Sequence, residues 1–439
     1  MTVDLTLHTG SPLERQSPGA ALSRGAMGES GPSLMRRLVR TERHRKITAL
    51  LLIAPLATFL LFTFLLPIAG MLWRSVDDRD VARIMPQTTA AIGSWDGRGL
   101  PGEHTFAALA ADLATASQAR TLDLAAKRLN YDVNGFRTLL ATTARKLAQL
   151  GATAGLNEAD LKETLIRINP RWGEPNTWAA IRRASGPVTA FYLLSAIDLK
   201  RDASNRIIAA PKTVAIYREV LARTFTISLV VTLACLTLGF PLAYLLATAR
   251  PNVANLLMIL VLLPFWTSLL VRTMAWIVLL QNQGVVNGAL LDLGLIDHPV
   301  RLIFNRFGVY VAMIHVLLPF MILPIYSVMQ TISPAYMRAG LSLGAPPRVA
   351  FARVYLPLTM PGVGAGCLLV FILALGYYIT PALVGGAADQ MISYFIAFYT
   401  TDTVNWGMAS ALGAVLLTST LLLYGVYQRL VGADGMRLG

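Results

Sequence analysis

The amino-acid sequence predicts an all-α, polytopic membrane protein with six transmembrane helices and a mainly helical insertion on the outer side of the membrane. Of the 439 residues, 55% are hydrophobic and only 14% are charged, whereas a soluble globular domain carries about 25% charged residues. Six long stretches contain at most one charged residue, and each exceeds the roughly 20 apolar residues needed to cross a hydrocarbon core of ~30 Å. A soluble enzyme with one large core is therefore excluded.

The first predicted span covers residues 47–73, which include no charged side chain. Six basic residues lie just before it, between positions 36 and 46. Because Lys and Arg beside a span favour the cytoplasmic side, we expect residues 1–46 to form a disordered basic cytoplasmic tail, rich in Gly, Ser and Pro at its start. The apolar run is too long for the central region of a cleaved signal peptide.

Residues 74–218 are the only long charged segment after the first span. From Arg74 to Arg223 the chain has 21 basic and 15 acidic residues, and a long translocated domain is exempt from the charge rule for short loops. Apolar residues recur at helical spacing from Glu103 to Leu150. We therefore expect a mainly helical periplasmic insertion that serves as a scaffold or docking surface, because it has no Cys/His cluster and no nucleophile motif.

Residues 219–430 contain the other five predicted spans. Short loops rich in Lys and Arg are typical of the cytoplasmic side, and the loop after the fourth span carries three arginines and no acid. The outer loop from Asp389 to Asp402 has no basic residue. Six spans then place both chain ends in the cytoplasm, with residues 431–439 as a short tail.

Several kinds of chemistry have no sequence signal. No stretch matches the phosphate-binding loop of nucleotide hydrolases, and the last lysine of the chain is Lys212. The five histidines are isolated from one another and the two cysteines lie in apolar runs, so we expect no catalytic residue, metal site or cofactor. The net charge is +14, but basic residues beside membrane spans report topology. We therefore expect a lipid bilayer as partner and no nucleic acid.

The loop at 331–358 separates the fourth and fifth spans. Its sequence predicts a short helix, a turn from Gly344 to Pro347, and a second short helix stopped by Pro357. Arginines beside apolar residues suit a projection that inserts into a groove of a partner. The alternative is an interfacial helix on anionic lipid.

This loop resembles the coupling loop of bacterial ABC importer permeases. The resemblance lies in the spacing of Ala339, Gly344 and the ending Val354-Tyr355-Leu356-Pro357. It departs from the usual family pattern at Arg338 and Gly340, where Glu and Ala are common. The resemblance implies that an ATPase contacts a set of loop residues. They are Arg338, Ala339, Gly340, Gly344, Ala345, Phe351, Leu356 and Pro357.

Two further segments are similar to the first permease subunit of spermidine/putrescine-type importers, namely residues 263–276 and 375–386. The resemblance extends from about Tyr217 to Gln428 and leaves out the insertion. It implies a bacterial inner-membrane subunit that has no ATPase site of its own and works by alternating access. Its implied partners are a cytoplasmic ABC ATPase dimer, a second permease subunit and a periplasmic solute-binding protein.

The candidate residues for a translocation path are Trp266, Arg272, His315, Tyr377 and Tyr378. Aromatic rings can hold a cationic solute, which agrees with a small cationic or nitrogenous, polyamine-like substrate, although Tyr377 stands where polyamine permeases commonly have an acid. Each residue also has a structural interpretation. Arg272 can snorkel or pair at the outer face, His315 can hydrogen-bond a neighbouring helix, and the aromatic residues can belong to the interfacial belt.

Two other functions agree with the same spans. One is a secondary transporter or channel that is independent of ATP, although the spans after Glu219 have no acidic residue in their apolar cores, where ion-coupled carriers place one. The other is a membrane-anchored sensor whose outer domain binds a ligand. An importer permease transports its solute only with a partner ATPase, and this dependence distinguishes it from a secondary transporter, a channel or a sensor.

Overall fold

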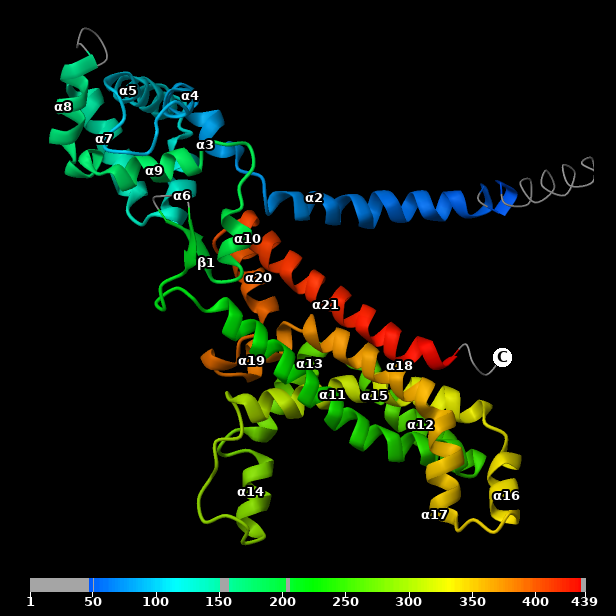
Figure 1. Cartoon of the computed structure of the whole chain (residues 1–439). Coiled ribbons are helices and arrows are strands. Elements are labelled where there is room, and N and C mark those ends of the chain that lie inside the picture. The colour runs from blue at the N-terminus through cyan, green and yellow to red at the C-terminus, as the bar shows by residue number, and fades with distance from the viewer. Residues whose placement is uncertain (1–46, 50, 151–157, 203–205, 436–439) are drawn as a thin grey trace, which may run out of the picture. The chain divides into compact units, whose positions relative to one another are not determined.

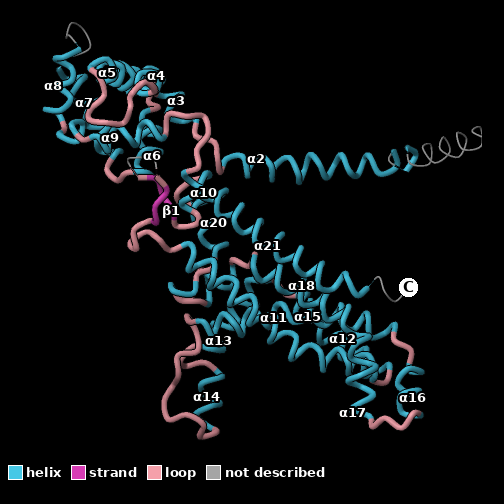
Figure 2. Tube along the Cα trace, viewed as in Figure 1, coloured by secondary structure: helices cyan, strands magenta, loops and turns pink. Residues whose placement is uncertain are grey.

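The computed structural model describes residues 47–49, 51–150, 158–202 and 206–435, and these residues are mostly helical (Figures 1 and 2). Within them, the one strand pair is β1 (Leu199–Arg201) with β2 (Ile207–Ala209), antiparallel, with Lys200 opposite Ile208. The predicted tail at 1–46 lies outside the described residues. The all-α fold class is confirmed.

Six described helical segments are long and apolar enough to cross a membrane. They are Ile47–Arg74, Tyr217–Thr248, Leu269–Asp292, Arg306–Thr331, Pro347–Leu375 and Trp406–Arg429. The first ends in the π-helical turn η1 (Leu61–Leu65) and helix α2 (Leu66–Arg74). Its apolar side chains are exposed, as shown by Leu52 at 78%, which a helix in contact with lipid tolerates.

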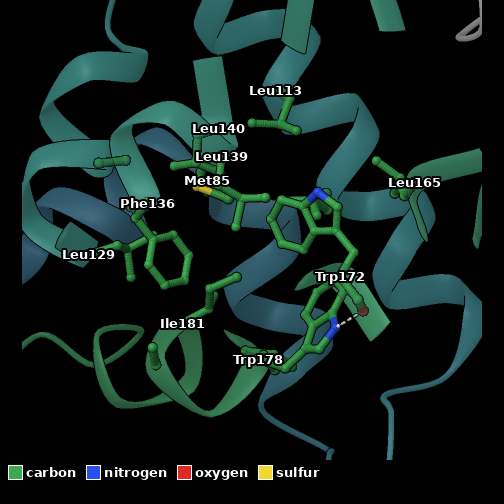
Figure 3. Close-up of a cluster of buried hydrophobic side chains, with 14 of the residues drawn as sticks. Met85, Leu113, Leu129, Phe136, Leu139, Leu140, Leu165, Trp172, Trp178 and Ile181 are labelled. Carbon is green, nitrogen blue, oxygen red and sulfur yellow. Dashed lines mark hydrogen bonds between the residues drawn. The ribbon is translucent and has the colours of Figure 1, made fainter. Parts of the chain in front are cut away.

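The insertion is folded around its own hydrophobic core. Its helices are α3 (Arg79–Ile84), α4 (Pro86–Ile92), α5 (Glu103–Gln118), α6 (Leu122–Asp132), α7 (Phe136–Leu150), α8 (Glu158–Ile168), η2 (Pro170–Gly173), α9 (Pro175–Arg183) and α10 (Phe191–Ser195). Figure 3 shows Trp172 and Trp178 inside this core, where both are fully buried. The Trp178 indole donates to the Trp172 carbonyl at 2.9 Å, and the Trp172 indole donates to Thr143 Oγ1 at 3.0 Å. Buried indoles need such acceptors, so the core is specifically packed.

The two ends of the insertion pair with each other. The amide of Thr189 donates to the Val76 carbonyl at 2.8 Å, and the amide of Asp78 donates to the Pro187 carbonyl at 3.2 Å. Beside this pairing, Arg128 of α6 forms a two-bond ion pair with Asp78 at 2.5 and 2.6 Å. The chain thus enters and leaves the helical insertion at one place.

Three long helices form the centre of the membrane region. They are α11 (Tyr217–Thr248), α15 (Arg306–Thr331) and α18 (Leu356–Leu375), which pack against one another. Glycines permit the close approach: a Cβ at Gly366 would lie 2.9 Å from Met321 Sδ, and one at Gly362 would lie 2.9 Å from Val328 Cβ. Small residues at helix contacts are typical of membrane bundles, where van der Waals packing stabilises association.

The sequence also predicts one of the five later spans within the apolar run at 251–291, but this run is not one unbroken helix. It forms α12 (Pro251–Leu262) and the 3-10 turn η3 (Leu263–Trp266), then restarts as α13 (Leu269–Leu280) and α14 (Val285–Asp292). Pro264 lacks an amide donor, and Ser268 Oγ accepts from the Val271 amide at 3.2 Å and so caps the new helix. Arg272 consequently lies in the first turn of α13 and not far along an unbroken span.

The prediction that Pro357 stops the second loop helix is wrong. Helix α17 (Pro347–Ala350) continues through the π-helical segment η4 (Phe351–Tyr355) into α18, so residues 347–375 form one helical span. A π-helical turn changes which backbone groups pair, and Pro357 sits near the start of the α-helical segment that follows, where a missing amide is tolerated. The loop is therefore continuous with the fifth span.

The last part of the chain forms α19 (Ile379–Val384), η5 (Ala387–Asp389), α20 (Ile392–Thr401) and α21 (Trp406–Gly435). Helix α21 extends to Gly435, so the expected tail at 431–439 begins as helix, and its last four residues lie outside the described part. A second apolar cluster joins α10 to α11, α20 and α21 and includes Tyr192, Tyr217 and Met408. The insertion is thereby packed against the membrane region.

Candidate functional site

The predicted coupling loop contains helix α16 (Pro334–Ser342), followed by a glycine turn and α17 (Figure 1). Ser333 Oγ accepts from the Ala335 amide at 3.3 Å and caps α16. At the other end, the Gly344 amide donates to the Leu341 carbonyl at 3.0 Å and the Ala345 amide donates to the Gly340 carbonyl at 3.2 Å. These two bonds form a Schellman motif, the common helix end with a left-handed residue after it.

Gly344 is the left-handed residue, with φ of +87°. A left-handed conformation costs an L-residue roughly 1–2 kcal/mol because its Cβ approaches the following carbonyl. Apart from its two chain neighbours, no described residue has an atom within 4 Å of a Cβ built at Gly344. Gly344 is therefore required for its left-handed backbone conformation, because a side chain at this position would meet no steric obstacle.

The two short helices of the loop contact each other through Gly340. A Cβ there would lie 3.5 Å from Ala350 Cβ and 3.8 Å from Val354 Cγ2, and Ala350 is only 1% exposed. This contact makes α16 and the start of the fifth span one packed unit. Helix α16 is therefore in direct contact with the helix that follows.

Aromatic rings connect this unit to α11. The Phe351 ring packs edge-on against Tyr244 at a centroid distance of 5.4 Å and stacks with Tyr355 at 5.5 Å. Tyr244 also packs edge-on against Tyr355 at 5.5 Å. Such pairs contribute about 0.5–1.5 kcal/mol each beyond buried area, so the loop is attached to the second span as well as to the fifth.

The remaining loop residues divide by exposure. Arg338, Ala339 and Gly344 are exposed, as is Pro357, whereas Gly340, Ala345, Phe351 and Leu356 are partly buried. Among the described residues no carboxylate pairs with Arg338. Leu343, at the tip, is 89% exposed. The outer surface of the loop is thus apolar and basic, and Phe351 and Leu356 belong to its inner side.

A second group of candidate residues meets inside the membrane region. The Trp276 indole donates to His315 Nδ1 at 3.1 Å, with the rings edge-on at 5.5 Å. Arg272 lies four residues before Trp276 on α13, which places both on one helix face, and Trp276 and Tyr377 both pack against the apolar core of the membrane region. Arg272 Nε is buried and has no hydrogen-bond partner among the described residues. The group Arg272, Trp276, His315 and Tyr377 is called the Arg272 cluster below.

The structure does not bring all five predicted path residues together. Trp266 is 86% exposed on η3, and Tyr378, 41% exposed, pairs with the Tyr394 ring at 6.3 Å. His315 does hydrogen-bond a neighbouring helix, as its structural interpretation expected. Sequence reasoning missed Trp276 as a partner. Its signal was the spacing of four residues from Arg272, which places both on one helix face.

Metal-binding chemistry finds no support in the part of the chain that is described, where no three His, Cys, Asp or Glu side chains converge. The Arg272 cluster can bind through hydrogen bonds, aromatic faces and one positive charge. The coupling loop can dock to a partner through exposed apolar and basic groups. Both arrangements are therefore suited to binding.

Comparison with known proteins identifies relatives of the membrane region. A family model described as a binding-protein-dependent transport system inner membrane component matches residues 239–432. The spermidine/putrescine transport system permease protein PotB of Escherichia coli K12 is 37% identical over 214 residues, 49% of this chain and 78% of that protein. PotB of Haemophilus influenzae is 36% identical over 245 residues, covering 54% and 85% of the two chains.

A more distant relative is the inner membrane ABC transporter permease protein YdcU of Escherichia coli K12, 32% identical over 50% of this chain and 73% of its own length. Among solved structures, a bacterial ABC transporter that imports the acidic polysaccharide alginate aligns over 48% of this chain and 80% of its own. That alignment has 20% identity and a TM-score of 0.37. The insertion at 74–218 lies outside the residues matched by the family model.

Proposed function

The chain belongs to the family of inner-membrane permeases of binding-protein-dependent ABC importers, and we propose that it transports a small nitrogenous solute delivered by a periplasmic binding protein. It is a multi-pass inner-membrane protein and a transport component. The observation that carries the proposal is the coupling loop at 331–358, whose exposed surface is continuous with the fifth span. A second permease subunit completes the path.

ATP hydrolysis by a cytoplasmic ATPase dimer drives the loop. The N- and C-termini and residues 331–358 share the cytoplasmic side, in agreement with the basic residues beside the spans. When the ATPase closes, it displaces α16. The contact at Gly340 moves the start of the fifth span, and the Phe351 and Tyr244 rings move α11 with it. The two helices then reorient together, as alternating access requires.

The solute is a small nitrogenous compound of low positive charge. The named solutes of the PotB relatives are spermidine and putrescine, which are polyamines. In this chain the charged member of the Arg272 cluster is itself basic, and no acid lies inside the apolar spans after Glu219. Like charges near each other are unfavourable in a medium of low dielectric, whereas aromatic faces and hydrogen bonds still favour a polar, nitrogen-rich molecule.

Reconstitution with defined partners tests the transport function. The chain is co-expressed with the ATPase, second permease and binding protein from its neighbouring genes, and uptake is measured in proteoliposomes with and without ATP. Uptake that needs both ATP and the ATPase supports the proposal. Equal uptake without the ATPase would show a secondary transporter or channel instead.

Competition assays test the solute class. Putrescine, spermidine and a mono-amine such as butylamine are added against the labelled solute found in the binding protein. We expect a solute with at most one net positive charge to compete best. Stronger competition by spermidine than by every compound of lower charge would contradict the argument from Arg272, and would leave the importer function unaffected.

A further inference from the structure

The insertion contains a cavity that the transport function does not use. Its volume is about 790 Å³, within the range of roughly 300–1,000 Å³ that is typical of small-molecule sites. The turn at 95–98, the end of α9, the start of α10 and strand β1 line it. Its apolar wall includes Trp95, Phe191 and Leu194. All of these residues precede the family-matched region at 239–432.

Basic side chains dominate the polar lining. The six basic residues are Arg98, Arg128, Arg182, Arg183, Lys200 and Arg201, against the three acids Asp96, Asp132 and Asp202. Two of these acids are in ion pairs, because Arg183 donates to Asp132 at 2.9 and 3.2 Å and Arg206 donates to Asp202 at 3.2 Å. No Asp or Glu oxygen among the described residues lies within 4.0 Å of the charged nitrogens of Arg98, Arg182 or Lys200. The cavity therefore has an excess of positive charge.

Arg182 is held at the cavity wall by packing. Its guanidinium lies 6.0 Å from the Trp95 ring centroid, a cation–π distance. Its Nη1 is 3.0 Å from the position that a Cβ of Gly97 would occupy, and Gly97 has φ of +88°. The glycine turn leaves room for the guanidinium beside the backbone. Arg182 is thus placed without any carboxylate partner to neutralise it.

Arg128 provides an independent indication that an acceptor is missing. Its side chain is only 3% exposed, and Nε and Nη2 donate to Asp78 at 2.5 and 2.6 Å. The guanidinium lies 4.6 Å from the Phe191 ring centroid. Its Nη1 is buried and has no hydrogen-bond partner among the described residues. A buried donor without an acceptor is unfavourable, and Arg128 is one of the residues that line the cavity.

We propose that this cavity binds a small organic anion that carries carboxylate or phosphate oxygens. Arg98, Arg182 and Lys200 bind the charged groups, the Trp95 and Phe191 rings cover the apolar part, and Arg128 Nη1 supplies a further donor. Guanidinium groups favour carboxylate and phosphate because their donors match the geometry of two oxygens. A nitrogenous cation is excluded from this cavity by its charge, so the ligand is not the transported solute.

Calorimetric titration of the full chain in phosphatidylcholine nanodiscs tests the site, with citrate and inorganic phosphate as anionic probes and putrescine as the cationic control. We expect saturable binding of at least one anion and none of putrescine. Comparison of citrate with phosphate tells a carboxylate ligand from a phosphate ligand. Absence of binding by both anions would overturn the proposal.

Matched variants connect binding to the cavity. Arg182→Gln and Lys200→Gln each remove one exposed positive charge that lines it, and each should weaken anion binding about tenfold or more, because a hydrogen bond to a charged group contributes about 1.5–3 kcal/mol. Arg145→Gln removes an exposed charge on α7 outside the cavity and should leave binding unchanged. Equal weakening by all three variants would show general charge attraction and overturn the site. Unchanged hydrogen-exchange protection of the Trp172 region verifies that each variant is folded.

Discussion

The substitution Gly344→Val tests whether the loop turn transmits motion. Gly344 has φ of +87° and closes a Schellman motif with two hydrogen bonds. A valine there pays roughly 1–2 kcal/mol for the left-handed backbone, and as a β-branched residue it is among the least tolerant of that region. A turn that refolds to avoid the strain loses both bonds, each contributing about 0.5–1.5 kcal/mol. Either route disfavours the observed loop by about 2 kcal/mol, or about 30-fold in population.

The assay compares ATPase co-purification and ATP-driven uptake at equal membrane abundance. We expect Gly344→Val to lower both strongly while membrane insertion is unchanged, because Gly344 lies between the fourth and fifth spans and outside both. Gly344→Asn is the graded comparison, since asparagine adopts the left-handed conformation far more often than valine, and it should retain more activity. Gly425→Val is the matched control, because Gly425 lies exposed in α21 with no atom within 4 Å of its Cβ.

Normal uptake by Gly344→Val would refute the role of this turn, and would favour a loop that only lies on lipid. Equal losses in Gly344→Val and Gly425→Val would also refute it, since the second glycine has no conformational requirement. A loss of ATPase binding in Gly344→Val with recovery in Gly344→Asn is the result that the backbone argument predicts.

Three other predictions concern the insertion. Trp178→Ala removes a fully buried ring and should destabilise the insertion by about 3–5 kcal/mol. This loss is measured as faster hydrogen exchange in α5 and α9 of the full chain. Unchanged exchange would contradict the packing in Figure 3. Asp78→Ala leaves the Arg128 guanidinium buried and unpaired, and should lower the stability of the insertion by about 3–5 kcal/mol. The expected readout is loss of hydrogen-exchange protection around 187–189. Asp123→Ala, exposed on α6, is the control and should cause no such loss. A cysteine at the exposed Ser117 should react with an impermeant thiol reagent in cells whose outer membrane is permeable; labelling only after the inner membrane is broken would reverse the topology.

The sequence predicted the spans because long apolar runs have few alternatives. A stretch such as 306–331 has its only charged residue at its first position, so its composition alone predicts a membrane-spanning helix. The turn in the loop at 331–358 was also predicted, because Gly344 and the prolines that follow it favour a turn through their own backbone preferences. Its continuation through Pro357 was not, because the π-helical turn at 351–355 depends on packing of Phe351 and Tyr355 against Tyr244.

The parts that escaped prediction depend either on local signals that lie within an apolar run or on contacts distant in sequence. The helix restart after Trp266 is set by the Ser268 cap and Pro264, signals that a count of apolar residues ignores. The pairing of Trp276 with His315 joins residues 39 positions apart, and no periodicity reports it. The basic cavity brings residues near 97, 128, 182 and 200 to one place, so its charge is visible only after folding.

Uptake in proteoliposomes tests the central account most directly. The purified chain is reconstituted with its second permease and binding protein, with or without the ATPase, and the initial rate of labelled-solute uptake is measured with ATP present. The account predicts uptake only when the ATPase is included, and loss of that uptake in Gly344→Val. Uptake at the same rate in the absence of the ATPase would contradict it.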